Sequence, residues 1–184
     1  PVAIKSEPLV DLTHIGNPII GDGATREMVD ELLGSATETM AKVLKFRPLE
    51  SVSISATDEH MNGFYNPRNG QMWLRANAIA DGPGIEKFET VTNPWSISSF
   101  ANTPREARRL TMLHEVGHHL HKSAGDAADV IIRERFENAA KASTHITEYG
   151  SRNHHEYFAE SWAAFNTIPE ILRANDPNGY EMVV

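Results

Sequence analysis

A short segment of the chain concentrates side chains that can bind a metal. Residues 110–122, LTMLHEVGHHLHK, contain four histidines and one glutamate, in a chain with nine histidines in total. His114 and His118 are four positions apart, so on a helix their side chains lie on one face, one turn apart. Two imidazoles placed in this way can bind one zinc ion at about 2.0–2.1 Å. Glu115 follows the first of them, where its carboxylate can act as a general base. This H-E-x-x-H motif predicts a site for one Zn²⁺.

Two imidazoles do not complete a zinc site, so the chain must supply a third ligand. One zinc-protease pattern places a further histidine six residues after the second, but Ala124 occupies that position. The later segment NHHEYFAESWAAF offers Glu156 and Glu160, which are four apart on one face of a predicted helix. We expect Glu156 to bind the metal. We expect Glu160 to accept the N–H on the far side of a ligand histidine, which would fix its tautomer.

Other residues compete for the role of third ligand. His121 lies on the same helix face as His114, although three ligands from one short segment fit a tetrahedron badly. His154 and His155 are near Glu156 in the sequence and are expected to be exposed. Glu156 itself has an alternative role, because Asn153-x-x-Glu156 is also a capping box in which the glutamate bonds back to its own helix start. These alternatives stay open at the level of sequence.

The helix that carries the motif has clear start and stop signals. Thr103-Pro104-Arg105-Glu106 combines a capping box with proline at the first helical position, and Gly125 suits the end of a helix. Gly117 inside it costs about 1 kcal/mol relative to alanine, which is tolerable where another backbone or the metal must come close. Residues 104–174 form the predicted helical, metal-binding half, in which further helices are expected to begin at Asp126, at Asn153 and near Thr167.

The N-terminal half mixes a helix with strands. Residues 1–23 are rich in proline and glycine and are expected to form an irregular lead-in. A helix is predicted from Thr25 to Phe46, and SVSISA at 51–56 alternates like a half-buried strand. The segment NGFYNPRNGQMWLRA predicts a hairpin whose turn is Asn66 to Gly70. Residues 81–103 are expected to form a long loop. The sequence therefore predicts an α+β fold with a small mixed β-sheet.

Composition narrows the class of protein. The 184 residues suit one domain spanning 1–184, and 17 basic against 25 acidic residues give a formal net charge of −8, which argues against nucleic acid as a partner. The absence of cysteine leaves histidine and carboxylates as the metal ligands. Neither a signal peptide nor a membrane span is visible, so we expect a soluble protein without membrane partners. Its location stays unknown: cytoplasmic, virion-associated or delivered into a host cell.

HEVGHHLH followed by ITEYGSRNHHEYFAESWAAF resembles the catalytic domain of anthrax lethal factor and its relatives, which include the Pro-Pro endopeptidases. The family pattern is H-E-x-x-H, then tyrosine, a short spacer and Glu-aromatic-Phe-Ala-Glu, and the match covers His114 to Phe165. The resemblance implies a compact zincin-like fold of the gluzincin type. It implies that His114, His118 and Glu156 bind zinc, that Glu115 is the base, and that the Tyr149 hydroxyl stabilises the oxyanion.

The whole chain also looks similar to domains found in phage head-morphogenesis proteins. That likeness suggests a phage or prophage origin and does not fix a role. We expect the chain to be part of a larger phage or toxin polypeptide.

The predicted function is that of a zinc metalloendopeptidase, in which Glu115 assists the attack of a zinc-bound water on a peptide bond. The partner would be an extended peptide or protein, lying beside the strand Met72-Trp73-Leu74 and adding to the sheet. Trp73 or the loop 81–103 could also line side-chain pockets. Two alternatives keep the same residues: a zinc amide hydrolase acting on cell-wall peptide links, and a non-catalytic virion or toxin module that retains the zinc fold.

Overall fold

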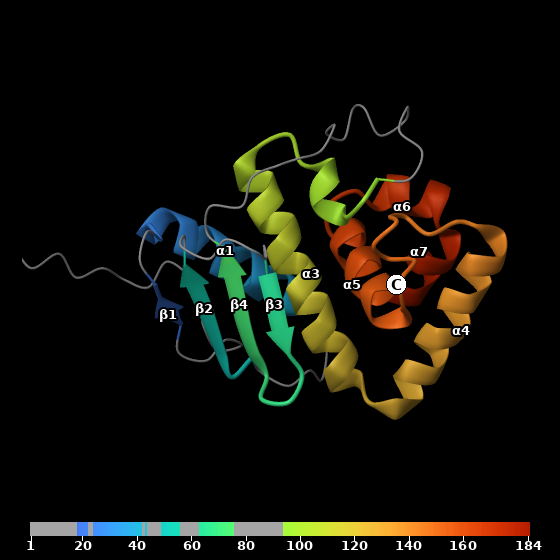
Figure 1. Ribbon diagram of the computed structural model, residues 1–184, viewed down its shortest axis with the longest axis horizontal. Coiled ribbons are helices and arrows are strands. Elements are labelled where there is room, and N and C mark those ends of the chain that lie inside the picture. The colour runs from blue at the N-terminus through green and yellow to red at the C-terminus, as the bar shows by residue number, and fades with distance from the viewer. Residues whose placement is uncertain (1–17, 22–23, 42, 44–48, 56–62, 76–93) are drawn as a thin grey trace, which may run out of the picture.

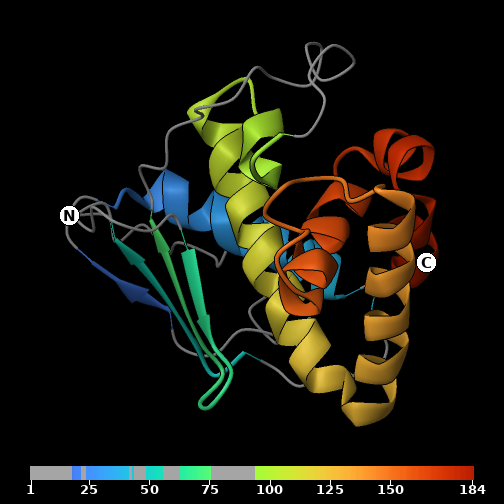
Figure 2. The ribbon, with the colours of Figure 1, turned by 45° about the vertical axis from the view of Figure 1, so that its right-hand side comes forward.

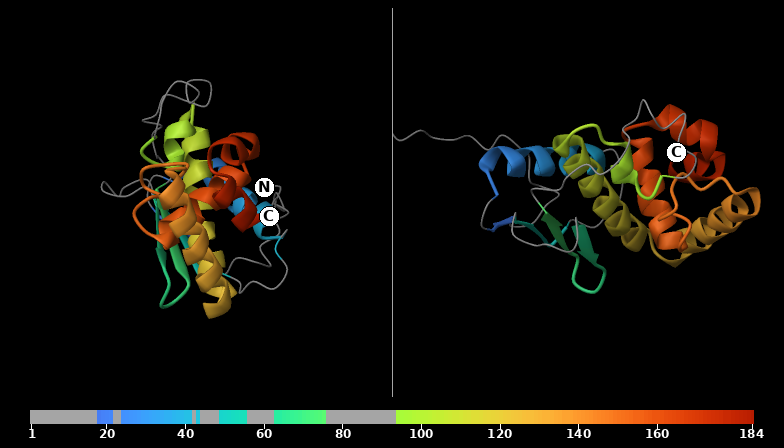
Figure 3. Two further views of the ribbon diagram at one scale, coloured as in Figure 1. Left: turned by 90° about the vertical axis from the view of Figure 1, so that its right-hand side faces the viewer. Right: turned by 45° about the horizontal axis from the view of Figure 1, so that its top comes forward.

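The computed structural model describes residues 18–21, 24–41, 43, 49–55, 63–75 and 94–184. It has the α+β architecture that the sequence predicts: a small mixed sheet near the N-terminus and a helical C-terminal half (Figure 1). Helix α3, Pro104–Ala124, lies between the sheet on one side and the later helices on the other (Figure 2, Figure 3). None of the described helices is long and apolar enough to cross a membrane.

The described sheet has the strand order β1-β2-β4-β3. Strands β1 (Ile19–Ile20), β2 (Ser51–Ser55) and β4 (Gln71–Arg75) run parallel, whereas β3 (Gly63–Asn66) is antiparallel to β4. The predicted hairpin is therefore present, and Gly70 in its turn has a φ of +65°, a conformation that favours glycine. The expectation of an irregular lead-in is wrong at Ile19–Ile20, because these residues pair with β2. Residues 1–17 and 22–23 lie outside the described residues.

Helix α1, Arg26–Met40, begins where predicted, since the Thr25 hydroxyl accepts from the Met28 N–H at 3.3 Å. It ends at Met40, before the predicted Phe46, which lies outside the described residues. Helix α3 starts with half of the expected capping box, because Thr103 Oγ1 accepts from the Glu106 N–H at 3.2 Å. The Glu106 carboxylate reaches one residue further back than the box predicts, and its Oε2 accepts from the Asn102 N–H at 2.6 Å. At its other end Gly125 has a φ of +80°.

Two hydrophobic cores meet on α3. One packs α1 and the inner faces of β2 and β4 against Met112, Val116 and Leu120. The other packs Leu110 and Leu113 against the C-terminal helices. Because both sides of α3 are buried, the rotation of this helix is fixed, and so is the direction in which its histidines point.

The helical half contains more elements than predicted. After α4 (Asp126–Ala142) and α5 (His154–Phe165) come α6 (Pro169–Asn175) and a further helix, α7 (Pro177–Val183), so helical structure extends beyond residue 174. The predicted loop 81–103 contains a 3₁₀ helix, η1 (Ile97–Phe100), while 81–93 lies outside the described residues. Helices α3 and α5 pack against each other and against η1, and they bring His114, His118, Glu156 and Glu160 together.

Asp176, at the start of α7, is a fully buried carboxyl that should make stability depend on pH. It accepts from Tyr157 Oη and from the Gly179 N–H, both at 2.9 Å, yet burial raises its pKa from 3.8 to about 6. Between about pH 4 and 6 the folded chain therefore holds a proton that the unfolded chain releases. The contribution of Asp176 to the free energy of unfolding should thus fall as pH rises through this window, by on the order of 2 kcal/mol, and be constant above it.

Urea unfolding at a series of pH values tests this expectation. The difference in free energy of unfolding between the native chain and Asp176→Asn should change between pH 4 and 6 and level off above. The exposed Asp126→Asn is the matched control for the removal of one carboxylate charge. Equal pH profiles for the native chain and Asp176→Asn would contradict the raised pKa.

Candidate metal centre

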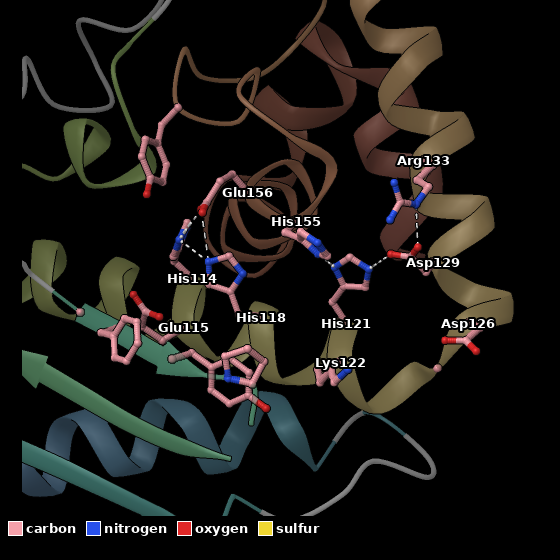
Figure 4. A pocket seen from close by; sticks show the side chains of 16 residues that line it. His114, Glu115, His118, His121, Lys122, Asp126, Asp129, Arg133, His155 and Glu156 are labelled. Carbon is pink, nitrogen blue, oxygen red and sulfur yellow. Dashed lines mark hydrogen bonds and ion pairs between the residues drawn. The ribbon is translucent and has the colours of Figure 1, made fainter. Parts of the chain in front are cut away.

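The three predicted metal ligands come together. Nε2 of His114 and Nε2 of His118, one turn apart on α3, lie 3.0 Å from each other. Oε2 of Glu156, from the first turn of α5, lies 3.2 Å from each of these nitrogens (Figure 4). The Glu156 side chain does not take part in a capping box, which was the alternative left open by the sequence. Asn153 caps the helix by accepting from the N–H groups of His155 and Glu156, and the Glu156 carboxylate faces the histidines instead.

The spacing of these three atoms fits one cation. Ligands about 2.0–2.1 Å from a tetrahedral ion lie about 3.3–3.4 Å from one another, close to the observed 3.0 to 3.2 Å. Oε2 of Glu156 is buried and, apart from the two imidazoles, has no hydrogen-bond partner among the described residues. His114, His118 and Glu156 could therefore hold a metal ion and leave one tetrahedral position for another molecule.

The electrostatics of the group also call for a positive charge. Burial disfavours the protonated form of His114, but the carboxylates of Glu156 and Glu160 outweigh this and raise its pKa well above the ordinary value. Burial likewise opposes ionisation of Glu156, and the two imidazoles outweigh it and lower its pKa. In the metal-free chain a proton supplies the positive charge. A divalent cation can replace that proton, so metal binding should release protons.

Glu160 supports His114 from the side away from the centre. Its Oε1 lies 2.7 Å from Nδ1 of His114, in the relation that the sequence predicted. Its Oε2 accepts from Thr147 Oγ1 at 2.7 Å and from the Ile97 N–H at 2.6 Å. The carboxylate is almost fully buried, and these contacts fix its position. Thr147 and Ile97 were not identified from the sequence, since neither belongs to a motif and Ile97 is 63 residues away from Glu160.

Glu115 lies beside the centre without joining it. Its side chain is 5% exposed, and burial raises its pKa, which brings a carboxylate closer to the range where it can both accept and return a proton. Gly63, the first residue of β3, packs directly against it. A Cβ at Gly63 would stand 2.6 Å from Oε1 and 2.8 Å from Cγ of Glu115. The absence of a side chain at Gly63, which the sequence did not single out, makes room for the predicted base.

We expect Gly63→Ala to displace the Glu115 carboxylate without disturbing the ligands. If Glu115 acts as a base, the catalytic rate should fall about tenfold or more, because a 1 Å misplacement can cost about 100-fold. Metal content, measured by mass spectrometry on the purified variant, should stay equal to that of the native chain. Gly34→Ala, with no atom within 4 Å of the added Cβ, is the matched control. Unchanged activity in Gly63→Ala would show that the Glu115 position is not limiting.

Tyr149 lies at the edge of the centre, half-buried. The centroid of its ring is 5.9 Å from the ring centroid of His114. The Arg152 guanidinium lies over the Tyr149 ring, 4.7 Å from the same centroid. A backbone hydrogen bond of 2.7 Å from the Tyr149 N–H to the Trp95 carbonyl fixes this segment. Burial, followed by the charges of Glu156 and Glu160, raises the pKa of the phenol. Tyr149 therefore stays protonated near neutral pH and can donate a hydrogen bond into the cleft.

A cleft of about 590 Å³ opens over the centre, with β3 along one side and α3, α4 and α5 along the other. The prediction that a substrate pairs with the strand Met72-Trp73-Leu74 is wrong. It belongs to β4, which pairs with β2 on one side and β3 on the other, so it has no free edge for another strand. Met72 and Leu74 are each 1% exposed and belong to the core. In the described sheet the edge beside the cleft is β3.

The other histidines considered as third ligand are not part of this centre. His121, His154 and His155 gather instead around Asp129, as a second group that could hold a metal ion. His121 and His154 are buried, which differs from the expected exposure of His154, and only His155 is exposed among the three. No motif in the sequence pointed to Asp129 as part of such a group.

Comparisons with known proteins do not assign the chain to a family. A scan against protein-family models finds no match, and a search of curated proteins finds no relative with significant similarity. The resemblance to lethal factor-like domains thus stays a prediction based on the motif residues. What the centre does must be inferred from its geometry and chemistry.

Proposed function

We propose that the chain is a zinc-dependent metalloendopeptidase. The observation that carries the proposal is the position of Glu156, whose carboxylate meets the two imidazoles of H-E-x-x-H at 3.2 Å while Glu115 stays beside them. Two histidines and one glutamate are the ligand set of zinc hydrolases that keep a fourth position open. Imidazole nitrogens favour zinc over magnesium or calcium, which prefer oxygen ligands. A bound zinc ion would supply Lewis acidity and lower the pKa of water.

The residues of the chain have separate tasks in this proposal. Glu115 accepts the proton of the attacking water and passes it to the leaving amine, a role that its raised pKa supports. The Tyr149 hydroxyl donates a hydrogen bond to the developing oxyanion, a contact of the kind worth about 2.7–4 kcal/mol. Glu160 holds His114 through Nδ1, so that Nε2 faces the cleft. Glu115 and Glu160 are held by burial, and Tyr149 by contacts of its ring with Trp95 and Arg152.

The substrate is proposed to be an extended peptide that lies along β3. Within the described part of the sheet, β3 pairs on one side only, with β4. Gly63, Phe64 and Tyr65 of this strand line the cleft together with His114 and Glu115. A peptide that adds to this edge gains main-chain hydrogen bonds and passes the base. Phe64, which is 47% exposed, offers an apolar contact for one substrate side chain.

A cleavage screen tests the proposal. The full chain is assayed after zinc loading, after chelation and after zinc is restored, against proteome-derived peptides and against peptidoglycan fragments. We expect cleavage of internal peptide bonds that disappears on chelation and returns with zinc. Cleavage of peptidoglycan stems alone would support an amide hydrolase of cell-wall links. A chain that binds zinc and cleaves neither set would support the non-catalytic module.

A further inference from the structure

A second group of metal-ligand side chains lies where three helices meet. His121 comes from the last turn of α3, Asp129 from the first turn of α4, and His154 and His155 from the first turn of α5. One ligand atom from each of these four residues lies within 4.8 Å of the others. We propose that these four residues, here called the imidazole cluster, bind a second divalent transition-metal ion. The proposal does not depend on the activity proposed for the first centre.

The contacts of the imidazole cluster centre on one carboxylate oxygen. Oδ1 of Asp129 lies 2.8 Å from Nε2 of His121 and 3.0 Å from Nε2 of His154. His155 stands against both histidines: its Nδ1 is 3.3 Å from Nδ1 of His121, and its ring centroid is 3.9 Å from that of His154. In Figure 4 the side chains of His155, His121 and Asp129 point toward one another. The distances from Asp129 Oδ1 to His121 and to His154 are close to those between two ligands of a single ion, and His155 also offers a ligand atom within 4.8 Å of the others.

Arg133 orients the carboxylate. Its Nε lies 2.7 Å from Oδ2 of Asp129, one turn away on α4, which leaves Oδ1 directed at the imidazoles. A ligand carboxylate held through its other oxygen is a common outer contact of metal sites. The guanidinium also balances the charge of Asp129. The imidazole cluster therefore consists of three imidazoles beside the Arg133–Asp129 ion pair. Such a nitrogen-rich set selects zinc, copper, nickel or cobalt rather than calcium or magnesium.

A hydrogen-bonded network without metal is the competing explanation. Asp129 Oδ1 can accept from both His121 and His154, and this would account for two of the three imidazoles. In that network the contact of His155 is the 3.3 Å approach of its Nδ1 to Nδ1 of His121, which is long for a hydrogen bond. The His155 ring is exposed, and yet it lies tilted against the rings of both His121 and His154. A shared cation explains why three imidazoles, two of them buried at 5% and 9% exposure, gather beside one carboxylate.

A cation in the imidazole cluster would connect the ends of α3, α4 and α5. His121, Asp129 and His155 line the same cleft as His114 and Glu115. The second ion would therefore lie in the wall of the cleft and hold the corner at Gly125, where α3 gives way to α4. Binding to the folded state alone would raise the melting temperature, because ligands of the native state stabilise it.

Zinc titration calorimetry and metal analysis of the full, chelator-treated chain test the proposal. The native chain should bind two zinc ions. Asp129→Asn and His155→Ala should weaken one of the two sites at least tenfold and leave the other unchanged, as expected for the loss of a ligand. Asp126→Asn, an exposed carboxylate in the same first turn of α4, is the matched control and should keep both sites. Glu156→Gln, which impairs the first centre, should still bind one zinc ion.

Two results would overturn the inference. One is a native chain that binds a single zinc ion which Glu156→Gln removes. The other is a second ion whose affinity is the same in Asp129→Asn, His155→Ala and the native chain. Circular dichroism checks that each variant is folded. If Asp129→Asn does not fold, two other measurements test the inference. They are the zinc affinity of the exposed variant His155→Ala and the zinc-dependent rise in melting temperature of Glu156→Gln. Two zinc ions in a chain that cleaves no peptide would support this inference and contradict the proposed function.

Discussion

Replacing Glu115 by glutamine is expected to lower the rate of peptide cleavage by about 1,000-fold or more while the metal stays bound. Glutamine has the shape of glutamate but cannot accept the proton of the attacking water, and a positioned general base contributes about 100- to 10,000-fold. Glu115 is not among the three residues whose ligand atoms converge. The metal content of Glu115→Gln should therefore equal that of the native chain. Single-turnover cleavage of a peptide from the screen, with metal analysis of the same sample, measures both quantities.

A nearby exposed glutamate provides the control for this substitution. Glu148→Gln makes the same chemical change next to Tyr149, on a side chain directed to solvent, and should cleave at the native rate. If Glu115→Gln lost its metal, the loss of activity would say nothing about a base. If it kept the metal and cleaved within tenfold of the native rate, Glu115 would not be the base and the proposed mechanism would be wrong.

The part of the centre that could be predicted from the sequence is the part set by helical periodicity. His114 and His118 are one turn apart on a helix with strong caps, and Glu156 and Glu160 repeat this spacing on α5. Once both helices are recognised, the remaining question is whether they pack together. Gly117 indicated a close approach on α3, and the structure confirms this, since the Ala159 backbone of α5 lies against it.

Features that depend on distant pairing could not be predicted in the same way. The hairpin pattern, with short apolar arms around Asn66 to Gly70, marks Met72-Trp73-Leu74 as part of a strand. The same pattern fits a central strand and an edge strand, and strand order follows from pairings between remote segments. The imidazole cluster has the same difficulty, because Asp129 is 8 residues from His121 and 25 from His154. No motif connects these positions. Only the packing of three helices brings them together.

The contact between α3 and α5 leads to the largest expected effect on stability. A Cβ at Gly117 would lie 2.8 Å from the Cα of Ala159 and 3.3 Å from its carbonyl oxygen. Backbone atoms cannot move aside as a flexible side chain can, so any larger residue at Gly117 must push the helices apart. We expect Gly117→Leu to lower the free energy of unfolding by more than about 3 kcal/mol, the upper range for overpacking. Gly117→Ala should lower it by about 1–2 kcal/mol, because its better helix propensity offsets part of the strain.

A glycine-to-alanine substitution where the added Cβ has room separates the effect of steric strain from that of helix propensity. Gly34 lies in the interior of α1 and has no atom within 4 Å of an added Cβ, so Gly34→Ala should raise the free energy of unfolding by about 0.5–1 kcal/mol. Ala159 lies between Glu156 and Glu160, so pushing α5 away from α3 also moves the third ligand and the support of His114. Gly117→Ala should therefore bind zinc at the first centre more weakly than Gly34→Ala does. Urea unfolding of the chelated chains and zinc titration measure the two effects. Equal stability of Gly117→Ala and Gly34→Ala would contradict the close approach of the helices, and with it the packing that brings Glu156 to the histidines.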